Sequence, residues 1–121
     1  MHDPNFVILY VADPAASAAF YTRLLDHAPV EASPTFAMFK LESGTMLGLW
    51  SRAGVLPAPE AMPGGSEIAI AVTAEADVDR LHTSWAGRGL AIAQAPTDMD
   101  FGRTFVALDP DGHRVRVFAP R

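Results

Sequence analysis

The sequence contains no cysteine, which excludes disulfide bonds, thiolate nucleophiles and thiolate metal ligands. It also lacks any run of the roughly 20 uninterrupted apolar residues that a membrane-spanning helix needs, and its first residues lack the basic and apolar segments of a signal peptide. Only 19% of the residues are charged, and the net charge is −5. The sequence therefore predicts a cytoplasmic protein that binds neither nucleic acid nor a membrane.

Hydrophobic residues make up 50% of the 121 positions, which argues against wholesale disorder. This length suits one compact domain with a sizeable core and excludes two full-size domains. We expect a single domain over residues 1–121, with one module at about 4–52 and a second at about 66–121. The segment between them, 53–65, is rich in proline and glycine and is predicted to be a connector.

The first module reads as a strand, a helix and three further strands. Residues 6–11 are rich in β-branched and aromatic side chains and are followed by Asp13 and Pro14, which suit an N-cap and the first helical position. The helix is predicted over Pro14–Leu25, and its apolar side chains at intervals of four residues form the expected buried stripe: Ala16, Phe20 and Leu24. Three short apolar runs separated by turn residues predict the remaining strands: 28–32, 35–41 and 46–51.

The same order of elements returns in the second module. Residues 67–72 predict a strand, and apolar residues at helical spacing predict a helix that ends near residue 87 or 89: Val78, Leu81 and Trp85. Further strands are predicted at 91–94, 103–108 and 114–118, with Asp98 and Asp100 in a solvated loop. Aligning Phe6 with Glu67 brings the stripes of both helices into register. We therefore predict an α+β fold of two tandem βαβββ modules forming a curved mixed sheet around a cleft.

Two motifs add to this repeat: Tyr10-Val11-Ala12-Asp13 leading into Phe20-Tyr21-x-x-Leu24-Leu25, and Asp109-Pro110-Asp111-Gly112-His113 before the last strand. With these motifs the chain resembles the vicinal oxygen chelate superfamily, which includes glyoxalases, bleomycin-resistance proteins and extradiol dioxygenases. The resemblance implies a glyoxalase-like fold and a homodimer. Within the superfamily, the run Phe101-Gly102-Arg103-Thr104-Phe105 looks most like phenazine antibiotic resistance proteins of the drug-binding type.

The resemblance also bears on metal binding. Enzymes of the superfamily hold a divalent metal with His or Glu at four positions, which correspond here to Phe6, Gly48, Glu67 and Arg116. Only Glu67 carries a metal-ligating side chain, and an arginine in the same ring opposes a bound cation. We therefore expect a member that binds its ligand without a metal or another cofactor, and we assign no catalytic residue.

Period-two alternation separates core side chains from cleft side chains on each strand. The expected core residues are Val7, Leu9, Val11, Leu47, Leu49, Val115 and Val117. The predicted ligand-binding residues are Phe6, Tyr10, Met46, Gly48, Trp50, Glu67, Arg103, Arg116 and Phe118. Aromatic rings supply stacking surface, Gly48 leaves room for a flat ligand, and Arg116 or Arg103 is expected to pair with a carboxylate.

These residues suit a planar, partly anionic small molecule, so we expect sequestration of an aromatic antibiotic that is phenazine- or mitomycin-like. The main alternative is an enzyme, either a metal-dependent lyase, isomerase or dioxygenase with displaced ligands, or a metal-free one with Glu67 as general base. A third reading is a protein-association module whose cleft is filled by its own side chains. Glu67 and Arg116 also suit a purely structural ion pair.

Overall fold

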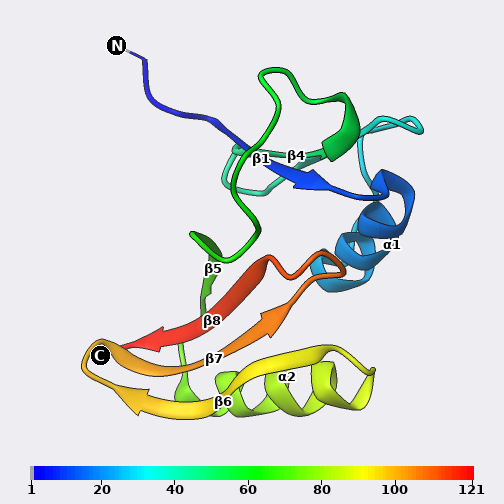
Figure 1. Ribbon diagram of the computed structural model, residues 1–121. Coiled ribbons are helices and arrows are strands. Elements are labelled where there is room, and N and C mark those ends of the chain that lie inside the picture. Colours follow the sequence, from blue (N-terminus) through cyan, green and yellow to red (C-terminus); the bar gives the residue numbers. More distant parts are fainter. Residues whose placement is uncertain (1) are drawn as a thin grey trace. The chain divides into compact units, whose positions relative to one another are not determined.

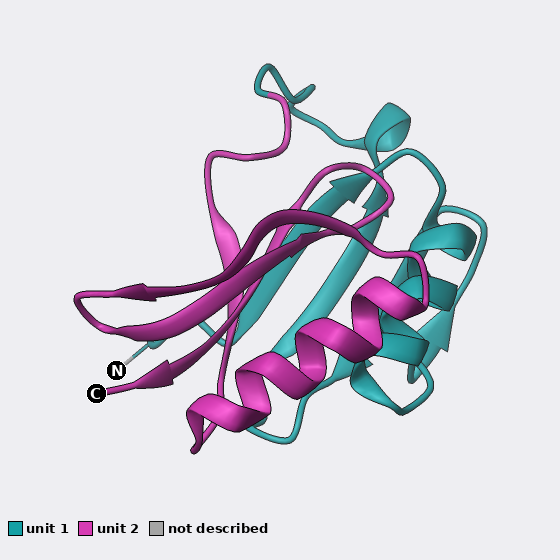
Figure 2. Cartoon of the chain, turned by 90° about the horizontal axis from the view of Figure 1, so that it is seen from below, with its two compact units in different colours: residues 1–61 teal, residues 62–121 magenta. Residues whose placement is uncertain are grey.

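The computed structural model describes residues 2–121, which form two α-helices, eight β-strands and one short 3-10 turn (Figure 1). The chain divides into two compact units, residues 1–61 and residues 62–121 (Figure 2). The boundary falls inside the segment predicted to be a connector. Neither helix within residues 2–121 has the length and apolar composition needed to span a bilayer.

Unit 1 contains the predicted strand, helix and three strands. The elements are β1 (Phe6–Val11), α1 (Pro14–Leu25), β2 (Glu31–Ala32), β3 (Phe36–Lys40) and β4 (Met46–Ser51), followed by a 3-10 turn at Arg52–Gly54. The sheet order is β1-β4-β3-β2. Strand β1 runs parallel to β4, and the other pairs are antiparallel. Strand β2 is shorter than the predicted run at 28–32.

Helix α1 begins and ends where the sequence predicted, but it buries a different stripe. The Asp13 Oδ1 atom accepts hydrogen bonds from the backbone N–H groups of residues 15 and 16, at 3.1 and 3.4 Å, which confirms the N-cap. The buried residues are Pro14, Ser17, Ala18 and Tyr21. The predicted stripe through Phe20 is therefore wrong by one position, or about 100° of helix rotation. Tyr21 is 1% exposed, and the small residues Ser17 and Ala18 let the helix approach the sheet closely.

The core of unit 1 lies between α1 and the sheet strands it contacts, β3 and β4. Leu9, Val11, Leu47 and Leu49 are buried, as the alternation predicted. Val7 is 43% exposed, so its assignment to the core is wrong. Val7 lies near the start of β1, which is the edge strand of the sheet, beyond the strands that α1 contacts.

Unit 2 repeats the order. Its elements are β5 (Glu67–Ala71), α2 (Glu75–Gly87), β6 (Ala91–Met99), β7 (Gly102–Leu108) and β8 (Arg114–Pro120), and its sheet order is β5-β8-β7-β6. Helix α2 contacts β6, β7 and β8 (Figure 1). Val78 and Trp85 are buried as predicted, and the Trp85 ring meets Phe105 edge-on with 5.3 Å between centroids. Val115 and Val117 complete this core.

Strand β6 is longer than the sequence predicted. It continues through Pro96 to Met99, with register shifts against β7 between Ile92 and Gln94 and between Gln94 and Thr97. A proline cannot donate a hydrogen bond to a neighbouring strand, so it is tolerated best in an edge strand or at a bulge. Strand β6 is an edge strand of its sheet. Asp98 therefore lies in a strand rather than in the predicted solvated loop.

The two sheets repeat in register as well as in order. In unit 1, Phe6 lies opposite Met46 and Ile8 lies opposite Gly48 across the parallel pair β1/β4. In unit 2, the same places along β5/β8 pair Glu67 with Arg114 and Ala69 with Arg116. Four positions therefore correspond between the units: Phe6 with Glu67, Met46 with Arg114, Ile8 with Ala69, and Gly48 with Arg116. Three of the four carry a charged side chain in unit 2 and none does in unit 1.

Candidate ligand-binding site

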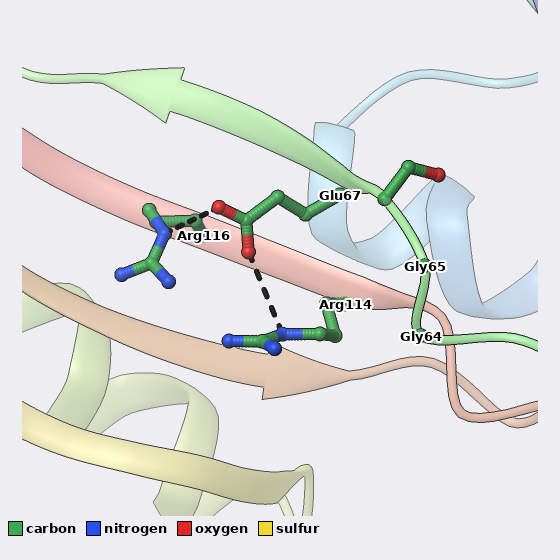
Figure 3. Close-up of a pocket in the computed structure, with 6 residues that line it drawn as sticks. Gly64, Gly65, Glu67, Arg114 and Arg116 are labelled. Carbon is green, nitrogen blue, oxygen red and sulfur yellow. Dashed lines mark hydrogen bonds and ion pairs between the residues drawn. The ribbon is translucent and has the colours of Figure 1, made fainter.

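A pocket of about 330 Å³ opens in unit 2 where the loop 64–66 enters β5 beside the start of β8. Glu67 lies between two arginines in this pocket (Figure 3). The Arg116 Nε atom donates to Glu67 Oε1 at 2.6 Å, and the Arg114 Nε atom lies 3.5 Å from Glu67 Oε2. We call Glu67, Arg114 and Arg116 the arginine cluster. Its two guanidinium groups share one carboxylate, so one positive charge is not compensated within it.

Arg116 is held by several neighbours in addition to Glu67. Its Nη1 atom donates to Gln94 Oε1 at 3.2 Å and to Thr104 Oγ1 at 3.1 Å. Thr104 is fully buried and donates in turn to the Val117 carbonyl oxygen at 2.8 Å. The guanidinium carbon lies 5.9 Å from the centre of the Phe101 ring. With its side chain only 15% exposed, Arg116 is fixed in one position.

Arg114 differs from Arg116 in its surroundings. Its side chain is 40% exposed, and its only ion pair among residues 2–121 is the 3.5 Å contact with Glu67. The Nε atom is buried and has no hydrogen-bond partner within the described chain. Buried polar groups normally make a hydrogen bond, whereas this atom has only the ion-pair contact with Glu67 Oε2, so Arg114 is held less firmly than Arg116.

Arg103 lies apart from the arginine cluster. It donates to Asp79 of α2 at 2.9 Å and to Asp98 of β6 at 3.1 Å. The hydrogen bond to Asp79, and next the one to Asp98, raise the pKa of Arg103 above its ordinary value. Successive side chains on a strand point to opposite faces, so Arg103 lies on the α2 side of β7, whereas Thr104 faces Arg116. The structure therefore does not bring Arg103 and Arg116 to one site.

Aromatic side chains gather on one face of the sheet in unit 1. By register and alternation Ile8 and Met38 lie on this face opposite Gly48. The residues around them, which we call the aromatic face, are Phe6, Tyr10, Phe36, Met46 and Trp50. The rings of Tyr10 and Trp50 meet edge-on with 6.2 Å between centroids, and Phe6 and Tyr10 are 41% and 36% exposed. The face therefore offers ring surface to a ligand or a partner.

The centre of the aromatic face is filled by the chain's own rings. A Cβ atom added at Gly48 would lie 3.0 Å from Phe36 Cζ and 3.1 Å from Phe6 Cε1. Gly48 was expected to leave room for a flat ligand, but Phe36 and Phe6 fill that space. A planar ligand on this face would have to stack on these rings and not beneath them.

Phe118 is the remaining residue predicted to bind ligand. It is half-buried on β8 and meets the exposed Phe101 ring edge-on with 5.9 Å between centroids. The predicted residues thus fall into two groups, one on the aromatic face of unit 1 and one around the arginine cluster of unit 2. Four neighbours were not predicted from the sequence to be ligand-binding residues: Phe36, Gln94, Phe101 and Thr104. Arg114, which strand alternation places on the same face as Arg116, was not predicted to bind ligand either.

The side chains at the superfamily's metal positions do not suit a divalent cation. Glu67 supplies one carboxylate, which is already paired with two guanidinium groups. Phe6 and Gly48 supply no donor side chain. No group of three or more His, Cys, Asp or Glu residues within positions 2–121 is arranged to hold a metal ion. A divalent site needs three or four such ligands, so the donor set and the local charge both disagree with metal binding.

Residues 4–117 match the model of the Glyoxalase/Bleomycin resistance protein/Dioxygenase superfamily, and the chain belongs to this superfamily. It is 35% identical over 118 residues to the phenazine antibiotic resistance protein EhpR of Enterobacter agglomerans, which covers 94% of this chain and 89% of the relative. The family prediction is therefore confirmed.

Solved structures confirm the fold. A protein from Agrobacterium tumefaciens, determined by solution NMR, is 49% identical with a TM-score of 0.92, covering 100% of this chain and 99% of the other. A glyoxalase-related enzyme from Fulvimarina pelagi is 25% identical with a TM-score of 0.83, covering 98% of this chain and 88% of the other. The α+β, glyoxalase-like fold predicted from the two modules is thus observed.

Proposed function

We propose that this protein binds a planar aromatic antibiotic, of the phenazine type or a similar shape, and confers resistance by sequestering it. The observation that carries the proposal is the aromatic face of unit 1, where Phe6 and Tyr10 are exposed and Trp50 lies against Tyr10. Each well-placed ring pair contributes about 0.5–1.5 kcal/mol beyond the area it buries. The similarity to a phenazine antibiotic resistance protein supports an antibiotic-binding role.

Binding is proposed to be independent of a metal. Arg116 occupies the place of a metal-ligating residue and forms a 2.6 Å ion pair with Glu67, the one carboxylate at these positions. A cation placed there would meet two guanidinium groups. Without a metal or a group that activates the ligand, the function that fits best is retention of the ligand unchanged.

We further propose that the protein acts in the cytoplasm as a homodimer and does not bind nucleic acid. The strands β1 and β5 lie at sheet edges, and Phe6, Val7 and Ile8 of β1 are all at least 41% exposed. Open edges with apolar side chains favour burial against a partner. The net charge of −5 disfavours a polyanion. Light scattering coupled to size-exclusion chromatography tests the dimer.

Tryptophan fluorescence tests ligand binding, because the two tryptophans have different surroundings. Trp50 is partly exposed on the aromatic face, whereas Trp85 is 2% exposed against Phe105. A panel of planar antibiotics should quench the wild type and Trp85→Phe saturably, with one site per chain. The quenching should disappear in Trp50→Phe. If calorimetry and fluorescence detect no binding by any member of the panel, the proposal is wrong.

Two further measurements separate binding from catalysis. Elemental analysis should find no stoichiometric transition metal in the purified protein. Mass spectrometry should recover the bound compound unchanged after prolonged incubation. One equivalent of metal per chain would contradict metal independence, and a modified product would favour an enzyme of the same superfamily.

A further inference from the structure

The arginines of the described chain differ in how much of their hydrogen-bonding capacity is used near the candidate site. Arg116 donates to Glu67, Gln94 and Thr104, and Arg103 donates to Asp79 and Asp98. Arg114 has one 3.5 Å ion pair and a buried Nε atom that no group of residues 2–121 accepts from. Of these three arginines, Arg114 uses the fewest of its five N–H donors within the described chain.

We infer that Arg114 anchors the carboxylate of a small aromatic acid in the pocket of unit 2. This inference rests on the proposed function for the class of ligand, a planar aromatic compound, and it is argued from the residues of unit 2 alone. The pocket is lined by Arg114 and Arg116, by Glu67, and by the loop residues Gly64, Gly65 and Ser66 (Figure 3). Its volume of about 330 Å³ suits an acid group with an attached ring.

The charge of the pocket favours one negative charge. Glu67 compensates one of the two guanidinium groups, which leaves a single positive charge for a ligand. A doubly charged phosphate would gain the same arginine but would meet the Glu67 carboxylate more strongly. A guanidinium presents its donors in a planar fork that matches the two oxygens of a carboxylate. A monocarboxylate therefore fits the charge and the geometry best.

The surroundings of Arg114 also explain why this arginine is available. Arg116 is fixed by the buried Thr104 hydroxyl and by Gln94, so it forms one wall of the pocket and orients Glu67. Arg114 lies opposite Glu67 across the β5/β8 pair and lines the pocket together with the loop 64–66. A bound carboxylate would accept from the Nη groups of Arg114, whose side chain is 40% exposed and whose Nε atom already faces Glu67. Arg116 is then a positioning residue, and Arg114 binds the ligand.

A pair of ligands that differ only in charge tests the inference. Phenazine-1-carboxylate and its uncharged carboxamide should be titrated into wild type, Arg114→Gln and Arg103→Gln. The wild type should prefer the acid by about tenfold, the effect of one charged hydrogen bond. Arg114→Gln should lose this preference while its affinity for the carboxamide stays within about twofold. Arg103→Gln is the matched control and should keep the preference.

The direction in which Glu67→Gln changes the affinity for the acid gives a second test. Glu67→Gln removes the negative charge that competes for Arg114, so the acid should bind more tightly while the carboxamide should not. An Arg114→Gln variant that keeps the full preference for the acid would overturn the inference, as would weaker binding of the acid to Glu67→Gln. Circular dichroism of each variant checks that it is folded.

A simple acid separates this inference from the proposed function. Benzoate should shift the NMR signal of the Arg114 Nε–Hε group saturably, even if no planar antibiotic quenches Trp50. Failure of the antibiotics alone would overturn the proposed function, whereas an Arg114 signal that does not respond to benzoate would overturn the carboxylate pocket. A larger response to inorganic phosphate than to benzoate would also overturn the assignment of a monocarboxylate.

Discussion

Glu67 makes its shorter ion pair with Arg116, at 2.6 Å, although the residue directly opposite it across the parallel strands is Arg114, at 3.5 Å. The residue opposite Arg116 is Ala69, whose small side chain does not obstruct an arginine reaching back along the strand. The guanidinium of Arg116 therefore extends toward Glu67 and leaves Arg114 only partly paired. This difference explains why one arginine is structural and the other is available to a ligand.

Removing the Glu67 carboxylate should destabilise the protein. Glu67→Gln leaves Arg116, whose side chain is only 15% exposed, without its anionic partner, and we expect a loss of about 1–3 kcal/mol in the free energy of unfolding. Urea denaturation measures it. Glu75→Gln is the control, because Glu75 pairs with Arg121 where both side chains are about half exposed, at 52% and 47%. Exposed pairs contribute little, so the loss there should be smaller. Equal losses in both variants would contradict a structural role for the Glu67–Arg116 pair.

The Thr104 hydroxyl should be as important for Arg116 as the Glu67 carboxylate. Thr104→Val preserves shape but removes the donor to the Val117 carbonyl and the acceptor for Arg116 Nη1. Leaving these groups without a partner in a buried site should cost about 1–3 kcal/mol. Thr104→Ser keeps the hydroxyl and loses one methyl group, which costs about 1 kcal/mol. Urea denaturation should therefore find Thr104→Val less stable than Thr104→Ser. A valine variant at least as stable as the serine variant would refute the role of the hydroxyl.

Local signals in the sequence were sufficient to predict most of the fold. Asp13 and Pro14 mark the start of α1, the turn Asp109–Gly112 separates β7 from β8, and alternation assigns Val115 and Val117 to the core. These signals act within a few residues, so they survive in any tertiary setting. The rotation of α1 was missed because a buried Tyr21 beside small residues is less apolar than a stripe through Phe20.

The candidate site was harder to predict because its contacts join residues far apart in sequence. Gln94 and Thr104 reach Arg116 only through the register of β6, β7 and β8, and β6 carries two register shifts that no local pattern reveals. Arg103 was predicted to be a ligand-binding residue, with Arg116 or Arg103 as the partner of a carboxylate, but in the structure Arg103 donates to Asp79 of α2. Successive side chains on a strand point to opposite faces, so Arg103 must face away from Thr104, which contacts Arg116. This rule alone would have placed Arg103 on the α2 side of β7.

Filling the small space at Gly48 should disturb the aromatic face. A Cβ there would approach Phe36 and Phe6 to 3.0 and 3.1 Å, so Gly48→Ala should destabilise by about 1–3 kcal/mol unless the rings turn aside. The variant should also weaken binding of any ligand that stacks on these rings. Gly87→Ala is the control, since nothing lies within 4 Å of its added Cβ. A stability loss at Gly87 as large as at Gly48 would show that glycine replacement as such is responsible.

The most damaging glycine replacement should be at Gly102, where β7 begins. The backbone has φ +146°, and an added Cβ would lie 1.9 Å from the Ala119 carbonyl oxygen on β8. Gly102→Ala must therefore separate the ends of β7 and β8, with an expected loss of at least about 3 kcal/mol in the free energy of unfolding. Gly112→Ala separates clash from backbone strain, because Gly112 has φ +91° but no atom within 4 Å of the added Cβ. Thermal and urea denaturation should show a clearly smaller loss of stability for Gly112→Ala than for Gly102→Ala. Equal losses would mean that the positive φ angle, and not the clash with Ala119, causes the destabilisation. Phe101 precedes Gly102 and contacts both Phe118 and the guanidinium of Arg116. Gly102→Ala should therefore also change the position of the Phe101 ring beside Arg116.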